Sequence, residues 1–213
     1  MAGIAAATAG SVCLASQTLD RVVASLGPEA ITASDVEQEY RFECFLEAQW
    51  PAPLPDSAAL AAAREHLTYQ KLLIREENPG PAEIAASEKA AEERLAEVRK
   101  QFAGAEDFQQ GLKELGMTET EVKGRLAQQE LMLRLIDQRL RPAASPSEEE
   151  VTDYYRSTFV PEFQKRNGGA AAPPLSEVED QIREVLIQER INELLDQWIE
   201  ELKPTSHVRF HSF

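Results

Sequence analysis

The sequence predicts a mainly α-helical, multi-helix fold, closed by a small antiparallel sheet that joins the two ends of the chain. Residues 173–210 read as one long amphipathic helix followed by a short strand, because apolar residues recur at steps of three, four and one. Residues 19–32 alternate between apolar and polar side chains on both sides of a Gly-Pro turn, which is typical of a β-hairpin. Between these ends, Ala-, Glu- and Leu-rich stretches are separated by proline and glycine, as helices joined by loops would be.

The composition is that of a globular protein with an acidic surface. The chain has 213 residues, 43% of them hydrophobic and 28% charged, enough for one moderate domain or two small ones. The formal net charge of −15 argues against a nucleic-acid partner and an anionic membrane surface, since both attract basic faces. Only Cys13 and Cys44 could pair, and we expect Cys44 to be a small buried hydrophobe instead.

Residues 1–18 are similar to a secretion signal that has lost its beginning. They are small, apolar and uncharged, and Cys-Leu-Ala before Ser16 matches a small-x-small cleavage site. The basic start of such a signal is missing, and a flexible tail is the alternative. The segment is too short and too poor in large apolar residues to span a membrane, so no direct membrane insertion is expected. The favoured reading places the protein in the periplasm or elsewhere outside the cytoplasm.

The remaining residues, 19–213, are expected to form a single domain. A hairpin of residues 19–32 needs a third strand, because two strands alone are marginal in water. Residues 207–213 supply it, since apolar Val208 and Phe210 alternate with polar neighbours. The intervening helices fall within residues 33–166, and a loop of residues 167–174 precedes the closing helix of residues 175–203.

Capping patterns and breakers locate the helices. The first helix begins at Thr32 or Ser34, since both start a capping-box spacing, and it ends before Pro51. Later helices are expected over residues 56–77, 83–102, 107–115, 118–140 and 147–159. Pro161 is expected to begin a loop that continues to Pro174.

The closing helix is the element on which the domain should assemble. Ser176 and Glu179 have capping-box spacing at its start, and Pro204 should prevent its continuation. Its apolar stripe, which includes Val185, runs from Val178 to Leu202 and is too wide to remain in water. We therefore expect the helix to dock among the N-terminal helices.

Four stretches resemble, in the same order, parts of the SurA/PrsA type of extracytoplasmic chaperone. The N-terminal hairpin and helix of that family are similar to LDRVVASLGPEAITASDVEQEY. Its short helix, glycine turn and long helix are similar to FQQGLKELGMTETEVKGRLAQQELMLRLIDQRL. Its tyrosine-containing helix resembles SPSEEEVTDYYRSTFVPEF, and its closing helix and strand resemble PLSEVEDQIREVLIQERINELLDQWIEELKPTSHVRF. Together these stretches cover most of the chain after Ser16.

The chain departs from that family where a parvulin-type prolyl isomerase domain usually lies. Only the loop ending at Pro174 separates the tyrosine-containing helix from the closing helix, whereas an isomerase domain needs about a hundred residues. The family's isomerase has active-site histidines, but His66, His207 and His211 all lie outside this loop. The resemblance therefore implies a chaperone scaffold without isomerase activity, and the chain is expected not to be an enzyme.

No catalytic, metal or cofactor site is predicted. In a strand, His207 and His211 would lie about 13 Å apart, too far to share one ion. His66 lies among alanines on a helix and reads as a surface or partly buried residue. The sequence contains no nucleophile elbow, Walker loop or dinucleotide fingerprint. A pair of catalytic carboxylates is possible among the many glutamates but has no supporting pattern.

Candidate client-binding residues are aromatic or apolar side chains beside loops. Trp50 ends a helix before a proline-rich loop, and with Leu54, Phe45 and Tyr69 it could form an exposed apolar lip. The alternative is that these residues cover the core. Phe159 and Phe163, which flank the short loop, have the same two readings.

Two functions of different classes follow. The first is an ATP-independent holdase that binds unfolded or outer-membrane-bound polypeptides reversibly, as a monomer or weak homodimer. The second is an acidic adaptor or structural protein that keeps the scaffold and binds one dedicated partner.

Overall fold

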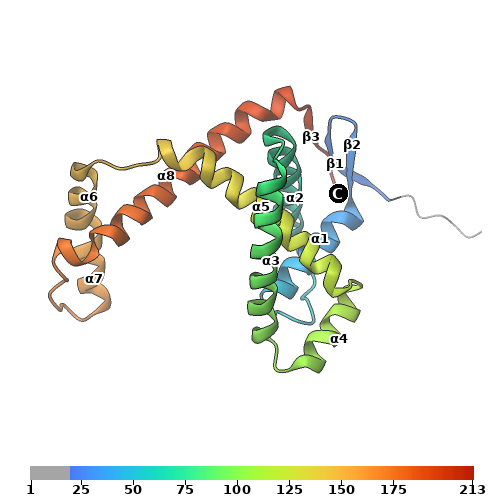
Figure 1. The fold of residues 1–213 in the computed structure, drawn as a ribbon, viewed down its shortest axis with the longest axis horizontal. Helices are drawn as coiled ribbons and strands as arrows, with labels where there is room; N and C mark the ends of the chain where they lie inside the picture. Colours follow the sequence, from blue (N-terminus) through green and yellow to red (C-terminus); the bar gives the residue numbers. More distant parts are fainter. Residues whose placement is uncertain (1–19) are drawn as a thin grey trace, which may run out of the picture.

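The computed structural model describes residues 20–213, which form an elongated arrangement of helices with one small sheet (Figure 1). Strands β1 (Val22–Leu26) and β2 (Glu29–Thr32) form the expected hairpin. Strand β3 (Val208–Phe210) pairs antiparallel with the other edge of β1, which gives the order β2-β1-β3. The predicted pairing of the two chain ends is confirmed.

A bulge decides which hairpin residues face the core. The pairing of β1 with β2 shifts between Val22 and Ala24, so Val23 and Ala24 are both buried although they are consecutive. They pack with Ile31, Val36 and Ala63 beneath the sheet. Strand β1 pairs with both β2 and β3. Because of the bulge, it turns two consecutive apolar side chains toward the core.

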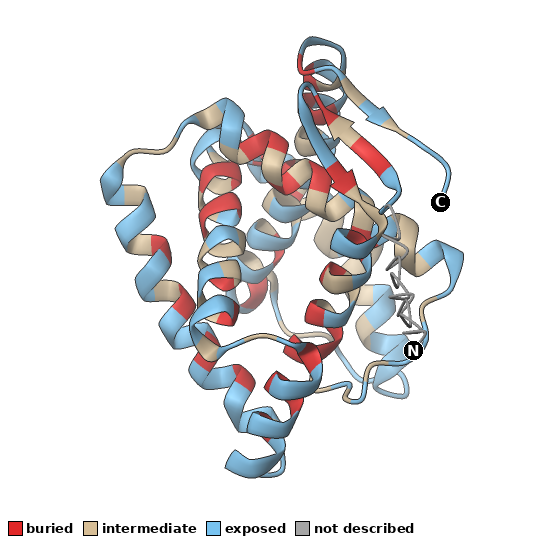
Figure 2. Cartoon of the chain, turned by 90° about the vertical axis from the view of Figure 1, so that its right-hand side faces the viewer, coloured by how far each residue is buried: buried red, intermediate tan, exposed pale blue. Residues whose placement is uncertain are grey.

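The main body consists of five helices. They are α1 (Ala33–Leu46), α2 (Ser57–Glu77), α3 (Pro81–Gln101), α4 (Ala105–Leu115) and α5 (Glu119–Leu140). Helix α1 starts after Thr32, which forms a full capping box with Asp35, so the first of the two predicted starts is the correct one. The buried positions line the faces on which these helices meet (Figure 2).

Two clusters make the core of this body. One joins α1, α3, α4 and α5 around Phe42, Phe45 and Phe108. The other joins α2 and α5 to the C-terminal half of α8 (Leu175–Thr205) around Leu72, Trp198 and Ile199. The closing helix therefore docks on the N-terminal helices, but only with half of its length.

The other half of α8 packs on a separate helical arm, seen at the far end from the sheet (Figure 1). This arm comprises α6 (Glu148–Tyr154), a π-helical turn η2 (Tyr155–Phe159) and α7 (Val160–Arg166). Val151 of α6 is buried against Val178 and Ile182 of α8. The apolar stripe of α8 is thus shared between two bodies, which explains its length.

The arm corrects one expectation about Pro161. The helix does not end there but continues to Arg166, and the loop is confined to residues 167–174. Pro161 is the second residue of α7, directly after the π-turn. In the π-turn before it, the Val160 N–H bonds to the Tyr155 carbonyl. The wider turn relieves the clash that a proline ring makes with the preceding turn of a regular α-helix.

Helix α8 corrects three further expectations. Ser176 and Glu179 form no capping box, because the N-cap is Pro174, two residues before Ser176, and Glu179 pairs with Arg183 instead. Pro204 lies inside the last turn, and the helix ends only at Thr205. Val185, which the apolar stripe was expected to include, is exposed.

Arginines fix the connection between the body and the arm. A 3₁₀ turn, η1 (Arg141–Ala143), leads from α5 toward α6, and Arg141 forms two 3.0 Å bonds with the Glu184 carboxylate of α8. Arg183 of α8 bonds Glu148 at 2.8 Å, and Arg190 bonds Glu150 at 2.5 Å. The start of α6 is therefore held on α8 by charge as well as by packing.

Within residues 20–213, no helix has the length and apolar character that a membrane span requires.

Candidate functional site

The first predicted client-binding residue, Phe45, lies in the core. It is fully buried, and its ring centroid lies 5.0 Å from that of Phe102 and 5.6 Å from that of Phe108. A Cβ added to Gly111 would lie only 2.9 Å from the Phe45 ring, so this position must lack a side chain for the ring to fit. Phe45 cannot belong to an exposed lip, and the alternative core role is the correct one.

Trp50 covers this core from outside. Its ring meets Phe45 edge-on at 5.9 Å, and its Nε1 donates a 2.8 Å hydrogen bond to the Glu114 carboxylate. Hydrogen bonds from Gln110 and then Trp50 lower the pKa of Glu114. The half-buried indole is thus held in place by a charged partner, as expected of a residue that closes a core.

Leu54 and Tyr69 lie in different surroundings. Leu54 is 97% exposed on the proline-rich loop, beside a cavity of about 290 Å³ that Tyr40 and Pro53 also line. Tyr69 instead packs edge-on against Phe210 of β3, with the Lys203 Nζ 5.2 Å from its ring centroid. The structure brings Phe45 and Trp50 together but does not join them with Leu54 and Tyr69 into one lip.

Phe159 and Phe163 lie together on the arm. Tyr155 stacks on Phe159 with centroids 5.8 Å apart, and Phe159 lies 6.0 Å from Phe163. The Tyr155 hydroxyl donates a 2.8 Å bond to the Pro173 carbonyl, which fastens the loop to the π-turn. Both phenylalanines are half-buried and line a cavity of about 250 Å³ with Tyr154. They retain the surface that contact with an apolar client segment would need.

A larger apolar recess, not predicted from the sequence, lies between α3 and α5. We call it the α3–α5 recess; it measures about 480 Å³, within the range of known ligand sites. Its lining residues are Ile84, Ser87, Glu88, Thr120, Lys123, Gly124, Ala127, Gln128 and Leu131.

The residues of the α3–α5 recess leave room for an apolar side chain. Gly124 has no side chain, and a Cβ built there would meet nothing within 4 Å. Ile84 at the rim is 42% exposed. Lys123, which lines the recess, has its charge paired with Glu92. Helices α3 and α5 thus lie together with a gap at this point, and the sequence alone could not show which helices enclose it.

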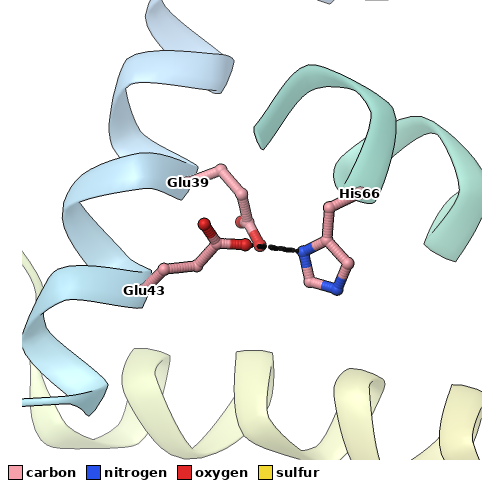
Figure 3. A group of neighbouring side chains, drawn as sticks. All are labelled: Glu39, Glu43 and His66. Carbon is pink, nitrogen blue, oxygen red and sulfur yellow. Dashed lines mark ion pairs between the residues drawn. The ribbon is translucent and has the colours of Figure 1, made fainter. Parts of the chain in front are cut away.

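A polar cluster lies between α1 and α2 (Figure 3). Glu39 and Glu43, one turn apart on α1, point toward His66 of α2. The His66 Nδ1 lies 2.8 Å from a Glu43 oxygen and 3.3 Å from a Glu39 oxygen. The cluster was not predicted from the sequence. The spacing of Glu39 and Glu43 puts them on one face of a helix, but only the packing of α1 on α2 places His66 beside them.

Burial and charge make this cluster unusual. The Glu39 side chain is only 4% exposed, and its second oxygen accepts a 3.1 Å bond from Arg125 of α5. The nearby carboxylates of Glu39, first, and Glu43, second, raise the pKa of His66 to about 9 against the opposing effect of burial. In the absence of another cation, the cluster therefore holds a proton on His66 at neutral pH.

No protein-family model matches the chain, and no curated protein matches it.

Proposed function

We propose that this protein is an ATP-independent holdase that binds unfolded or outer-membrane-bound polypeptides outside the cytoplasm, without covalent chemistry. The observation that carries the proposal is the α3–α5 recess, an apolar cavity of about 480 Å³ at the surface of the main body. A recess of this size accommodates one or two apolar side chains of an extended segment. The location outside the cytoplasm rests on residues 1–18, which lie outside the described residues.

The surroundings of the recess suit reversible binding. The exposed rim residue Ile84 offers apolar area, while the overall charge of −15 keeps copies of the protein apart. Phe159 and Phe163 provide a second aromatic surface on the arm, which a long client could reach as well. Two weak contacts with one client strengthen its binding, because the second contact is intramolecular.

The test measures whether the protein suppresses aggregation of a client diluted from denaturant, by light scattering. Ile84→Glu places a charge at the rim of the recess and should weaken suppression several-fold. Gly124→Leu should fill the recess and weaken suppression too, while favouring the helix, because leucine is the better helix former.

Leu133→Glu is the matched control. Leu133 is 55% exposed on α5 but does not line the recess, so the same substitution should leave suppression unchanged. Equal suppression by all variants would refute the recess as the client site. Failure of the unmodified protein to suppress aggregation, together with cross-linking to a single stoichiometric partner, would favour the adaptor function instead.

A further inference from the structure

We propose that Glu39, Glu43 and His66 form a binding site for Zn²⁺ that links α1 to α2. Each residue offers one ligand atom, and the three atoms lie within 4.8 Å of one another. The site is independent of the proposed client function, because it lies between α1 and α2 whereas the recess lies between α3 and α5.

The separations between the ligand atoms suit one ion. Ligands bound to zinc at 2.0–2.1 Å lie about 2.9 Å apart at right angles and about 3.4 Å apart at tetrahedral angles. The Nδ1 of His66 lies 2.8 Å from Glu43 and 3.3 Å from Glu39, close to these two values. Two of the three separations thus match zinc geometry, and the oxygens of Glu39 and Glu43 lie within 4.8 Å of each other.

The direction of the contacts supports an ion more than a hydrogen bond. The His66 Nδ1 is buried from solvent, yet it makes no hydrogen bond of acceptable geometry despite its short distances to both carboxylates. Figure 3 shows the two glutamate side chains extending from one face of α1 toward this nitrogen. A buried nitrogen without a well-aligned hydrogen bond, next to two carboxylates, is available to a metal ion.

The groups around the ligands fit the same ion. Arg125 binds one oxygen of Glu39 and thereby fixes the carboxylate with its other oxygen toward His66. Zinc must displace the proton of His66 to bind; once it has, the two carboxylates outweigh the charge of Arg125 and favour the cation. The imidazole favours zinc over calcium or magnesium, which prefer oxygen ligands. Glu43 and His66 are 37% and 32% exposed, which leaves a path for the ion and room for water as a further ligand.

The test is calorimetric titration of the chelator-stripped full chain with ZnCl₂. We expect one saturable site in the unmodified protein and at least about tenfold weaker binding in Glu43→Gln and in His66→Asn. The matched control is Glu37→Gln, which removes the same charge from the same helix at a residue outside the cluster, and its affinity should be unchanged.

Two additional measurements separate a lost zinc ligand from a lost fold. Circular dichroism must show that each variant is folded, and Glu43→Gln preserves the shape of a partly exposed side chain. Cobalt(II) should give visible absorption bands with the unmodified protein but not with Glu43→Gln. Absence of saturable zinc binding, or equal affinity in all variants, would overturn the proposal.

Discussion

At the scale of single residues, capping boxes form where the capping residue is also the residue that begins the helix. Thr32, Thr118 and Ser147 form complete capping boxes with the residue three positions later. The same spacing at Ser176 forms none, because Pro174 is the N-cap of α8 and Ser176 already lies inside its first turn. An arginine partner alone does not exclude a capping box, since Glu150 bonds both Ser147 and Arg190. Sequence spacing shows where a capping box can form but not which residue begins the helix.

Glu150 should make stability depend on pH in the acid range. Bonds from the Ser147 backbone, from Arg190 and from the Ser147 hydroxyl lower the pKa of Glu150 to about 2. Since the folded state lowers this pKa from an ordinary value of 4.5, the stabilisation is complete above about pH 4.5 and is lost as the pH falls toward 2. Glu150→Gln should therefore lower the urea midpoint at pH 7 but have less effect near pH 3.

Glu149→Gln is the control for this comparison. It removes the same charge from the same helical turn, but among the described residues the Glu149 side chain takes part in no hydrogen bond or ion pair. Its effect on the midpoint should be smaller than that of Glu150→Gln at pH 7. A pH-independent difference between the unmodified protein and Glu150→Gln would contradict the assignment.

At the scale of elements, α8 connects the two bodies. Ile182 is buried against the arm, whereas Ile191 and Trp198 are buried against α2 and α5. Val185, between the two contacts, is exposed. The arm rests on a small cluster of buried residues, so the arginine pairs of α8 contribute a larger share of its attachment than such pairs would in a main core.

Replacing Arg183 and Arg190 together by glutamine should loosen the arm without unfolding the body. We expect amide hydrogen exchange in α6 and α7 to become several-fold faster, while exchange in α1 to α5 stays the same. Arg166→Gln is the control, because Arg166 pairs only with Glu162 of its own helix among the described residues. Unchanged exchange in the double variant would show that apolar packing alone holds the arm.

At the scale of the whole molecule, the ends of the chain close the fold. The His211 N–H bonds to the Val23 carbonyl at 2.9 Å, and the Arg64 guanidinium lies 4.8 Å from the Phe210 ring centroid while bonding the His211 carbonyl at 2.8 Å. The first strand, the second helix and the last strand are therefore joined by contacts that span most of the sequence. Such contacts stabilise the native state but form late, because long loops must close first.

A chain that ends at Thr205 should test this closure. It loses β3 and the contacts of Phe210 with Tyr69 and Arg64, which should lower the free energy of unfolding by about 2–5 kcal/mol. A chain that ends at His211 keeps β3 and the bond to Val23, and should lose much less. Denaturant unfolding followed by circular dichroism measures both. Equal stability of the two chains would mean that β3 is dispensable.

The sequence by itself determined most of the helices, with α7 the exception, as well as the hairpin and the small sheet of this protein. These depend on local rules: the side-chain period, the turn chemistry of Gly27, and capping residues such as Thr32 and Thr118. Even the pairing of β1 with β3 was accessible, since a lone hairpin needs a third strand and one further stretch had the right alternation.

Only the tertiary structure decided which residues meet. It buried Phe45, left Leu54 exposed, divided α8 between two bodies, and placed His66 beside Glu39 and Glu43. The physical reason is that an apolar stripe specifies that a helix face is buried but not against what. The relative positions of the helices depend on how side chains from distant segments fit together.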